Sequence, residues 1–191
     1  MKMTAKSFGS RVRLDNFDAA KDFQRGAGIV RFSLWYLVKV FFFLTALPFP
    51  SGFKVLLLRM FGAKVGRGLT LKPRVNIHFP WKLSIGDYVW IGEEVCILNF
   101  ETVSIGNHVC LSQRVFLCGG NHDFRDPAFS YRNGPIVLED GCWLGAGCFA
   151  GPGVTVGTDA VAAAGSVITS DLSPNGVYKG NPLIYVTERW K

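Results

Sequence analysis

Aliphatic residues recur at every sixth position through the C-terminal half of the chain. From Leu138 onward these positions are Leu144, Ala150, Val156, Ala162 and Ile168, and a small residue usually follows each one. A period of six fits neither an α-helix, whose period is about 3.6, nor a half-buried strand, whose period is about 2. It predicts one short strand and one turn per unit, with three units closing a triangular coil of about 18 residues.

The same spacing recurs in three earlier segments, which strengthens the prediction. The aliphatic positions there are Ile85, Ile91 and Ile97; Ile105, Leu111 and Leu117; and, in a weaker form, Val65, Leu71 and Ile77. Two extra residues separate Ile77 from Ile85 and Ile97 from Ile105, and a longer insertion occupies residues 119–135. We therefore expect an all-β solenoid with a continuous apolar core. A β-sandwich is disfavoured because its period-2 alternation, with turns about every 8–12 residues, is missing.

An apolar region without this period precedes the coils. Residues 29–47 are dense in aromatic and aliphatic side chains and end at Pro48, and a second short helix is expected at 53–61. Lys39 interrupts the first segment, which is shorter than the roughly 20 residues needed to span a bilayer. Two interpretations stay open and do not exclude each other: a helical cap over the first coil, or an anchor lying in the membrane interface.

These patterns divide the chain into three parts. We expect an N-terminal arm with apolar helices at 1–62, a coil domain at 63–172 with an excursion loop at 119–135, and a C-terminal tail at 173–191. Within the arm, Asp15, Asn16 and Asp18 are candidate helix-start residues. The first thirty residues carry neither the apolar core nor the cleavage site of a signal peptide. We therefore expect a cytoplasmic protein, with residues 29–61 as its contact with the inner face of the membrane.

Charge and cysteine content narrow the range of ligands. The net charge of +7 suits anionic ligands such as cofactor phosphates, acidic glycans or lipid headgroups. No DNA- or RNA-binding motif accompanies this charge, so a nucleic-acid partner is not expected. All five cysteines fall within the coils without a C-x-x-C pair. We expect them to behave as small apolar residues within the coils, with Cys118 facing the coil, and we expect neither disulfides nor structural zinc.

The insertion carries the strongest candidate for catalysis. It contains Asn121-His122-Asp123, and a loop that leaves a rigid coil is a favoured position for functional side chains. A neutral histidine there can accept a proton from a hydroxyl in the transition state, typically worth about 10²–10⁴-fold in rate. His78 and His108 have no comparable loop. Cys118 is a weaker candidate, as a nucleophile.

The repeats resemble those of the hexapeptide-repeat acyltransferases, whose unit is an aliphatic residue, a glycine and four further residues. The resemblance covers about residues 65–182 and is nearest to the colanic-acid type of exopolysaccharide O-acetyltransferases. The segments that carry it are 58–64, 120–123, 126–127, 143–146, 162–169 and 180–182. It implies a left-handed parallel β-helix of about five coils, a homotrimer, and transfer of acetyl from acetyl-CoA to a hydroxyl without a metal.

The resemblance also implies roles for individual residues. His122 corresponds to the catalytic base, the backbone N–H of Ala146 to the oxyanion donor, and Trp143 to a residue beside the histidine. The implied cofactor contacts are Ala146, Ala164, Thr169, Ser170 and Lys179, and the implied acceptor contacts are Glu94, Asn99, Asn121 and Asp123.

Two positions depart from the family pattern. Ile184 stands where an arginine is usual, which leaves Lys179, Arg189 or Lys191 for the 3′-phosphate of CoA. Glu94 stands where galactoside-type enzymes have an asparagine, and Asn99 is the nearby substitute.

We therefore expect an acetyl-CoA-dependent O-acetyltransferase that acts on a sugar hydroxyl, in the biosynthesis of exopolysaccharide or another surface glycan. A lipid-linked glycan intermediate is the expected acceptor, because residues 29–61 would keep the enzyme near the membrane. Three alternatives stay open. The acceptor could be an antibiotic or serine, the fold could carry a zinc hydratase using His78, His108 and His122, or the solenoid could be a non-catalytic scaffold.

Overall fold

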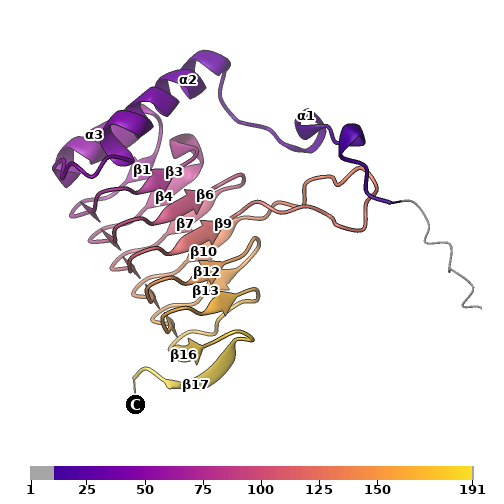
Figure 1. Cartoon of the computed structure of the whole chain (residues 1–191). Coiled ribbons are helices and arrows are strands. Elements are labelled where there is room, and N and C mark those ends of the chain that lie inside the picture. Colours follow the sequence, from indigo (N-terminus) through magenta and orange to yellow (C-terminus); the bar gives the residue numbers. More distant parts are fainter. Residues whose placement is uncertain (1–10, 191) are drawn as a thin grey trace, which may run out of the picture.

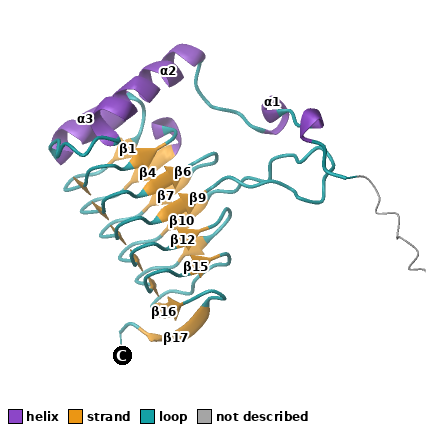
Figure 2. Ribbon diagram, in the orientation of Figure 1, coloured by secondary structure: helices purple, strands orange, loops and turns teal. Residues whose placement is uncertain are grey.

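In the computed structural model, which describes residues 11–190, the chain winds into a parallel β-solenoid of about six turns. Helices cover its first turn, and a long loop projects from its side (Figures 1 and 2). Three sheets, here called faces A, B and C, form the sides of the solenoid.

Each face stacks equivalent strands from successive turns. Face A contains β1 (Lys64–Val65), β4 (Leu83–Ile85), β7 (Val103–Ile105), β10 (Ile136–Leu138) and β13 (Thr155–Val156). Face B contains β2 (Thr70–Leu71), β5 (Trp90–Ile91), β8 (Cys110–Leu111), β11 (Trp143–Leu144), β14 (Val161–Ala162), β16 (Gly176–Lys179) and β17 (Ile184–Glu188). Face C contains β3 (Asn76–Ile77), β6 (Cys96–Leu98), β9 (Phe116–Cys118), β12 (Phe149–Ala150) and β15 (Val167–Ile168).

The aliphatic positions at six-residue spacing form the core of the solenoid. Ile91, Leu111 and Leu144 lie in register on face B and are fully buried. The equivalent positions on faces A and C are buried in the same way. This stacking confirms the predicted solenoid, because each coil covers the apolar residues of the next.

The C-terminal end differs from the prediction of about five coils and a tail. β16 adds a further parallel strand beside β14, and β17 returns antiparallel to β16. The hexapeptide pattern ends at Ile168, so no periodic signal predicts this last turn. Residues 173–190 therefore close face B instead of forming a separate tail.

The apolar N-terminal region is helical and packs on the first turn. It comprises α2 (Ile29–Val38), which continues into a π-helical turn, η2 (Lys39–Phe43), and α3 (Ser51–Met60). Trp35, Phe43 and Leu58 are buried beneath the helices, and the indole Nε1 of Trp35 donates to the carbonyl of Ile77 at 3.0 Å. Among the described residues, no helix has the length and apolar character needed to cross a bilayer.

One buried cation joins the helices to the coil. Lys54 of α3 is fully buried and donates from Nζ to the carbonyls of Leu71 and Lys72, at 3.2 and 3.0 Å. Burial lowers the pKa of this ammonium group. The carbonyls at the edge of the first coil need hydrogen-bond donors there, and Lys54 supplies them.

The cysteines fall into two groups. Cys142 and Cys148 point into the core and are buried, as expected. Cys96, Cys110 and Cys118 are only partly buried, because each follows or precedes an inward residue within its strand and therefore points outward. The expectation that Cys118 faces the coil interior was therefore wrong.

Candidate active site

The loop that carries His122 is a hairpin-like excursion between β9 and β10. Its two sides are joined by the bonds Gly134 N to Gly119 O at 3.0 Å and Arg132 N to Asn121 O at 2.8 Å. His122 itself forms an isolated antiparallel bridge with Tyr131. The paired backbone gives the histidine a defined position although it lies outside the solenoid (Figure 1).

The imidazole of His122 is held in one orientation. Its Nδ1 lies 2.7 Å from the carbonyl oxygen of Phe129, and its ring stacks on that of Phe129 with centroids 4.2 Å apart and planes 8° apart. Because a carbonyl oxygen can only accept a hydrogen bond, Nδ1 carries the proton in the neutral ring. Nε2 then keeps its lone pair, which is the protonation state that a general base requires.

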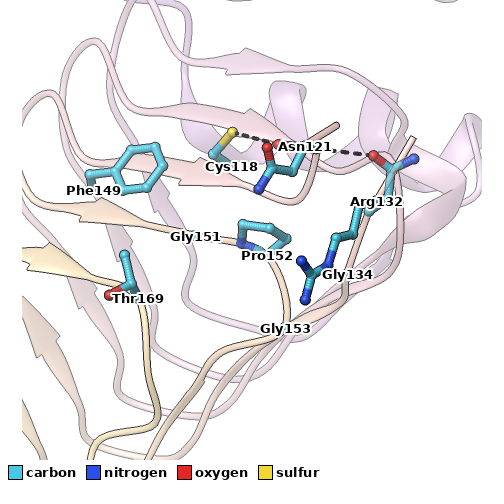
Figure 3. A pocket seen from close by; sticks show the side chains of 11 residues that line it. Cys118, Asn121, Arg132, Gly134, Phe149, Gly151, Pro152, Gly153 and Thr169 are labelled. Atoms are coloured by element: carbon cyan, nitrogen blue, oxygen red, sulfur yellow. Dashed lines mark hydrogen bonds between the residues drawn. The ribbon is translucent and has the colours of Figure 1, made fainter. Parts of the chain in front are cut away.

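An open cleft of about 600 Å³ lies between this loop and the outer surface of face C. It contains two predicted site residues, Asn121 from the loop and Thr169, which follows β15. The side-chain oxygen of Asn121 accepts from the backbone N–H of His122 at 2.8 Å. In Figure 3 the amide nitrogen of Asn121 and the guanidinium of Arg132 both point toward Pro152, across the cleft. Among the described residues that line this cleft, Arg132 is the one that carries a charge.

Trp143, Ala146 and Ala164 lie together along another corner, where the chain passes from face B to face C. The indole Nε1 of Trp143 donates to the hydroxyl of Ser112 at 3.0 Å, and the indole is 45% exposed. Gly145 allows the turns to approach closely, because an added Cβ would lie 2.5 Å from the backbone nitrogen of Ala164. Ala146 and Ala164 are exposed, and their N–H groups have no acceptor within the described chain.

The predicted residues are therefore divided between two corners of one chain. His122, Asn121 and Asp123 belong to the loop at the corner between faces C and A, whereas Trp143, Ala146 and Ala164 lie at the corner between B and C. Ser170 is exposed just after β15, and Lys179 ends β16 with an exposed side chain. In the loop, Asp123 accepts from the backbone N–H of Arg125 at 2.9 Å.

Glu94 lies in a turn between faces B and C, where two arginines hold its carboxylate. Arg114 and Arg74 contact it at 2.7 and 3.0 Å. Hydrogen bonds from Arg114 and, next, from Arg74 lower the pKa of the carboxyl group. The carboxylate is thus already paired with side chains of the preceding and following turns.

The structure contradicts the predicted contact between Asn99 and the acceptor. Asn99 is fully buried, its Oδ1 accepts from the backbone N–H of Phe79 at 2.9 Å, and its Nδ2 donates to the carbonyl of Phe79 at 2.6 Å. Both ends of the amide are used to join two successive turns. Asn99 is therefore a structural residue, and a polar side chain at a coil corner did not distinguish the two roles in the sequence.

The candidates for binding the 3′-phosphate of CoA differ in how far their side chains are already engaged within the chain. The guanidinium of Arg189 donates to the carbonyl of Gly141 at 2.7 Å and lies 3.9 Å from Asp159, so it is engaged within the chain. Ile184 is exposed in β17. Lys191 lies outside the described residues. Lys179 is the candidate whose described contacts leave it exposed to solvent.

The three histidines occupy different parts of the molecule. His78 follows β3 on face C, His108 lies in a turn between faces A and B, and His122 is in the loop. Burial and, next, the positive charge of Lys39 lower the pKa of His78, and the hydrogen bond to the backbone of Ile97 offsets only part of this shift. Within residues 11–190 no group of three or more His, Cys, Asp or Glu side chains is arranged to hold a metal ion.

Three aromatic contacts of His122 were not predicted. Phe129 and Tyr131 come from the far side of the same loop, and Phe17 comes from the N-terminal arm. The loop residues could have been suspected from their closeness in sequence. No periodic or motif signal links Phe17 to a residue more than a hundred positions away.

Comparison with known proteins places this fold and site in a family. Residues 135–170 match a family model described as "Hexapeptide repeat of succinyl-transferase". The chain is 37% identical over 176 residues to WcaF of Escherichia coli, named as an acetyltransferase of colanic acid biosynthesis, and the match covers 92% of this chain and 96% of that protein. It is also 31% identical to galactoside O-acetyltransferase of Escherichia coli, over 66% of this chain and 64% of that enzyme.

Solved structures agree with these matches. A hexapeptide-repeat acetyltransferase of Vibrio cholerae, complexed with acetyl coenzyme A, superposes with a TM-score of 0.77 at 24% identity, over 87% of this chain and 92% of that chain. A galactoside acetyltransferase in complex with coenzyme A gives a TM-score of 0.73 at 24% identity, over 82% of this chain and 80% of that chain. At this identity the structures show the common fold. With the close match to WcaF over nearly its whole length, they show that this chain belongs to the hexapeptide-repeat acetyltransferases.

Proposed function

We propose that the protein transfers acetyl from acetyl-CoA to a sugar hydroxyl, with His122 as general base. The orientation of His122 carries this proposal, because the bond from Nδ1 to Phe129 leaves the lone pair of Nε2 for the acceptor hydroxyl. The hydroxyl oxygen attacks the thioester carbonyl as Nε2 takes its proton. When the carbon–sulfur bond breaks, the protonated imidazole returns that proton to the leaving thiolate.

The B–C corner supplies what the developing oxyanion needs. The N–H of Ala146 has no acceptor within the described chain, and no long side chain covers it. A fixed backbone donor of this kind is typically worth about 10²–10³-fold in rate. Small residues at 145, 146 and 164 also allow the pantetheine arm of CoA to approach the backbone, and Lys179, at the end of β16, lies at the same corner. Thr169 and Ser170 follow β15 at the C–A corner, so their proposed contact with CoA would lie on the other side of face C.

A homotrimer would bring the two corners together. In one chain the loop with His122 and the corner with Ala146 lie at different edges of face C. Parallel packing of protomers would place the loop of one against the B–C corner of its neighbour, so each site would use two chains. Asn121, Asp123 and Glu94 would then be candidates for contact with the acceptor.

A sugar hydroxyl is the acceptor that best agrees with the relatives. One is named for colanic acid biosynthesis and another for acetylation of galactosides. We propose further that the acceptor is a glycan intermediate of surface polysaccharide synthesis. A lipid-linked intermediate fits best, because the apolar helices described below would hold the enzyme at the membrane where such a substrate lies. The cleft beside the loop is open and lined largely by polar and small residues, which suits a hydrated sugar.

Two variants test the catalysis and the shared site together. His122→Ala should lower kcat by about 10²–10⁴-fold with an unchanged melting temperature, and Ala146→Trp should block the groove at an exposed position. Co-expression of the two variants in equal amounts should restore about a quarter of wild-type activity, because about one site in four would combine two intact halves. Full activity of His122→Ala would refute the base assignment. A monomeric mass, or no restoration in mixed trimers, would refute the shared site.

The helical cap also supports contact with a membrane. Its buried residues pack on the first turn, but many apolar side chains on the same helices and on the segment between them are more than half exposed: Ile29, Val30, Leu34, Leu37, Phe41, Leu47, Leu56 and Met60. A soluble surface rarely exposes so many large apolar residues together. With the net charge of +7, these helices suit the interface of an anionic membrane.

Flotation with liposomes tests this contact. The wild type should float with vesicles containing anionic lipid and much less with neutral vesicles. Phe41→Asp, which places a charge at a residue 66% exposed on the cap, should lower the floated fraction. Val186→Asp on β17 is the matched control, because Val186 is exposed at the opposite end of the solenoid. Equal flotation of both variants would refute the contact.

A further inference from the structure

The N-terminal arm is attached to the His122 loop at one end and to the solenoid at the other. The arm contains η1 (Leu14–Asn16) and α1 (Ala19–Asp22). Asp18 caps the start of α1, and its side chain accepts from the N–H of Ala20. Figure 1 shows α1 beside the projecting loop. At the loop, the backbone N–H of Arg13 donates to the carbonyl of Pro127 at 2.9 Å.

The other end of the arm is fixed by two side chains of the solenoid. Trp81 donates from Nε1 to the carbonyl of Arg25, and Lys82 donates from Nζ to the carbonyl of Gln24, both at 2.7 Å. These bonds lie at the corner between faces C and A, two turns before the position where the loop leaves the coil. The arm therefore crosses from the solenoid to the tip of the loop.

Between these attachments, aromatic rings of the arm pack on both the loop and the coil. The ring of Phe17 meets those of His122 and Tyr131 edge-on, with centroids 5.3 and 5.2 Å apart. Phe23 packs on Phe100 of the coil at 4.7 Å and on Tyr131 at 5.8 Å. Tyr131 thus contacts both phenylalanines of the arm.

The coil supports the loop near its base. Bonds from Gly119 N to Leu98 O and from Gly153 N to Pro135 O tie it to the coil, and the ring of Tyr131 meets that of Phe100 edge-on with centroids 5.6 Å apart. Most other backbone bonds of the loop join its own two sides. Within one chain, an isolated two-stranded hairpin of this kind is only marginally stable by itself. Contacts from a second segment are therefore needed to fix side chains near its tip.

We propose that the arm is a strap that positions the catalytic loop, and that Phe17 is the positioning residue for His122. Phe129 covers one face of the imidazole and Phe17 packs its edge against the same ring. The ring then cannot rotate away from the carbonyl of Phe129 without losing the contact with Phe17. The catalytic consequence rests on the proposed role of His122 as base, because Phe17 would act only through it.

Three variants of the full-length protein test the strap. Phe17→Ala removes the ring, Phe17→Tyr keeps it, and Leu14→Ala is the matched control, since Leu14 lies in the same arm and is 67% exposed. Phe17→Ala should lower kcat about 10- to 100-fold, the size of effect expected for a slightly misplaced catalytic group. The KM for acetyl-CoA and the melting temperature should stay unchanged. Phe17→Tyr should restore kcat, and Leu14→Ala should resemble the wild type.

Hydrogen exchange of residues 119–135 gives a measurement that is independent of activity. Phe17→Ala should increase amide exchange in this segment, and exchange in the coils should not change. Unchanged exchange in the loop, or faster exchange with unchanged kcat, would overturn the strap proposal. A fully active His122→Ala would instead overturn the base assignment, and loop exchange would still decide whether the arm orders the loop.

Discussion

Asn99 is the residue whose expected role the structure changes most, and its replacement tests that change. Asn99→Ala removes two hydrogen bonds between the side-chain amide of Asn99 and the backbone of Phe79. In one, the backbone N–H of Phe79 donates to Oδ1 at 2.9 Å; in the other, Nδ2 donates to the carbonyl of Phe79 at 2.6 Å. Both partners lie in a buried part of the C–A corner, where water does not replace them easily.

The size of the effect follows from these two bonds. A buried backbone group left without a partner costs about 1–3 kcal/mol, so two such groups predict a loss of roughly 3 kcal/mol in the free energy of unfolding. For a chain of this length, about 1 kcal/mol shifts the melting temperature by about 2–4 °C. Asn99→Ala should therefore melt about 6–12 °C below the wild type.

The assay combines thermal unfolding, followed by circular dichroism, with kinetics well below the transition. Asn107→Ala is the control, because Asn107 also accepts from a backbone N–H one turn away, that of Asp87 at 2.8 Å, but at a part-buried site. Its melting temperature should fall less. In both variants the KM for the sugar acceptor should match the wild type. A normal melting temperature of Asn99→Ala with a tenfold higher acceptor KM would refute this reasoning and return Asn99 to the acceptor site.

Three further predictions concern the core and the turns. Burial raises the pKa of the Cys142 thiol to about 12. The unfolded chain ionises near its ordinary value, so stability falls as pH rises from about 9 toward 12, by up to about 1.4 kcal/mol per pH unit. Urea unfolding at about pH 8 and pH 11 should show that Cys142→Ala loses less unfolding free energy than the wild type between these two pH values. An equal loss in both proteins would contradict the raised pKa of Cys142. Gly145→Ala should lower the melting temperature more than Gly147→Ala, because the new Cβ meets backbone in the first case and open space in the second. At Gly147 only the positive φ of 69° opposes alanine, at a cost of about 1–2 kcal/mol. Identical melting curves would show that the turns do not pack as described. Trp35→Phe should cost about 1–3 kcal/mol, because it leaves the carbonyl of Ile77 without its buried donor, and urea unfolding that matches the wild type would refute this.

The coils could be predicted because their physical constraint repeats. Each inward-facing residue must be aliphatic and each turn residue must be small or polar. Residues such as Leu111, Leu117 and Leu144 therefore occupy the same position in every six-residue unit. The position of His122 in a long loop followed from a break in that period. These features depend on neighbours in sequence or on a fixed spacing, and a single sequence records both.

The contacts that complete the site depend on partners without such spacing. Phe17 reaches His122 from the N-terminal arm, and Lys54 reaches the carbonyls of the first coil from α3. Asn99 and Asn121 are both asparagines at the C–A corner, yet one bridges two turns inside the molecule and the other lines the cleft. Only the three-dimensional arrangement separates these roles.

The corner between faces C and A is where the coils differ in length. On the other two corners the inward residues stay six apart from the first coil to the fifth, as in Val65 to Leu71 and Leu71 to Ile77. At the C–A corner the chain holds a short 3₁₀ turn, η3 (Pro80–Lys82), in the first coil, and the loop that carries His122 in the third. New segments can thus be grafted at this edge while the other two edges keep their register. The turn at residues 151–154 lies one coil after the loop at the same corner. Designed peptides inserted there would change which acceptors bind while the coils of the solenoid stay unchanged.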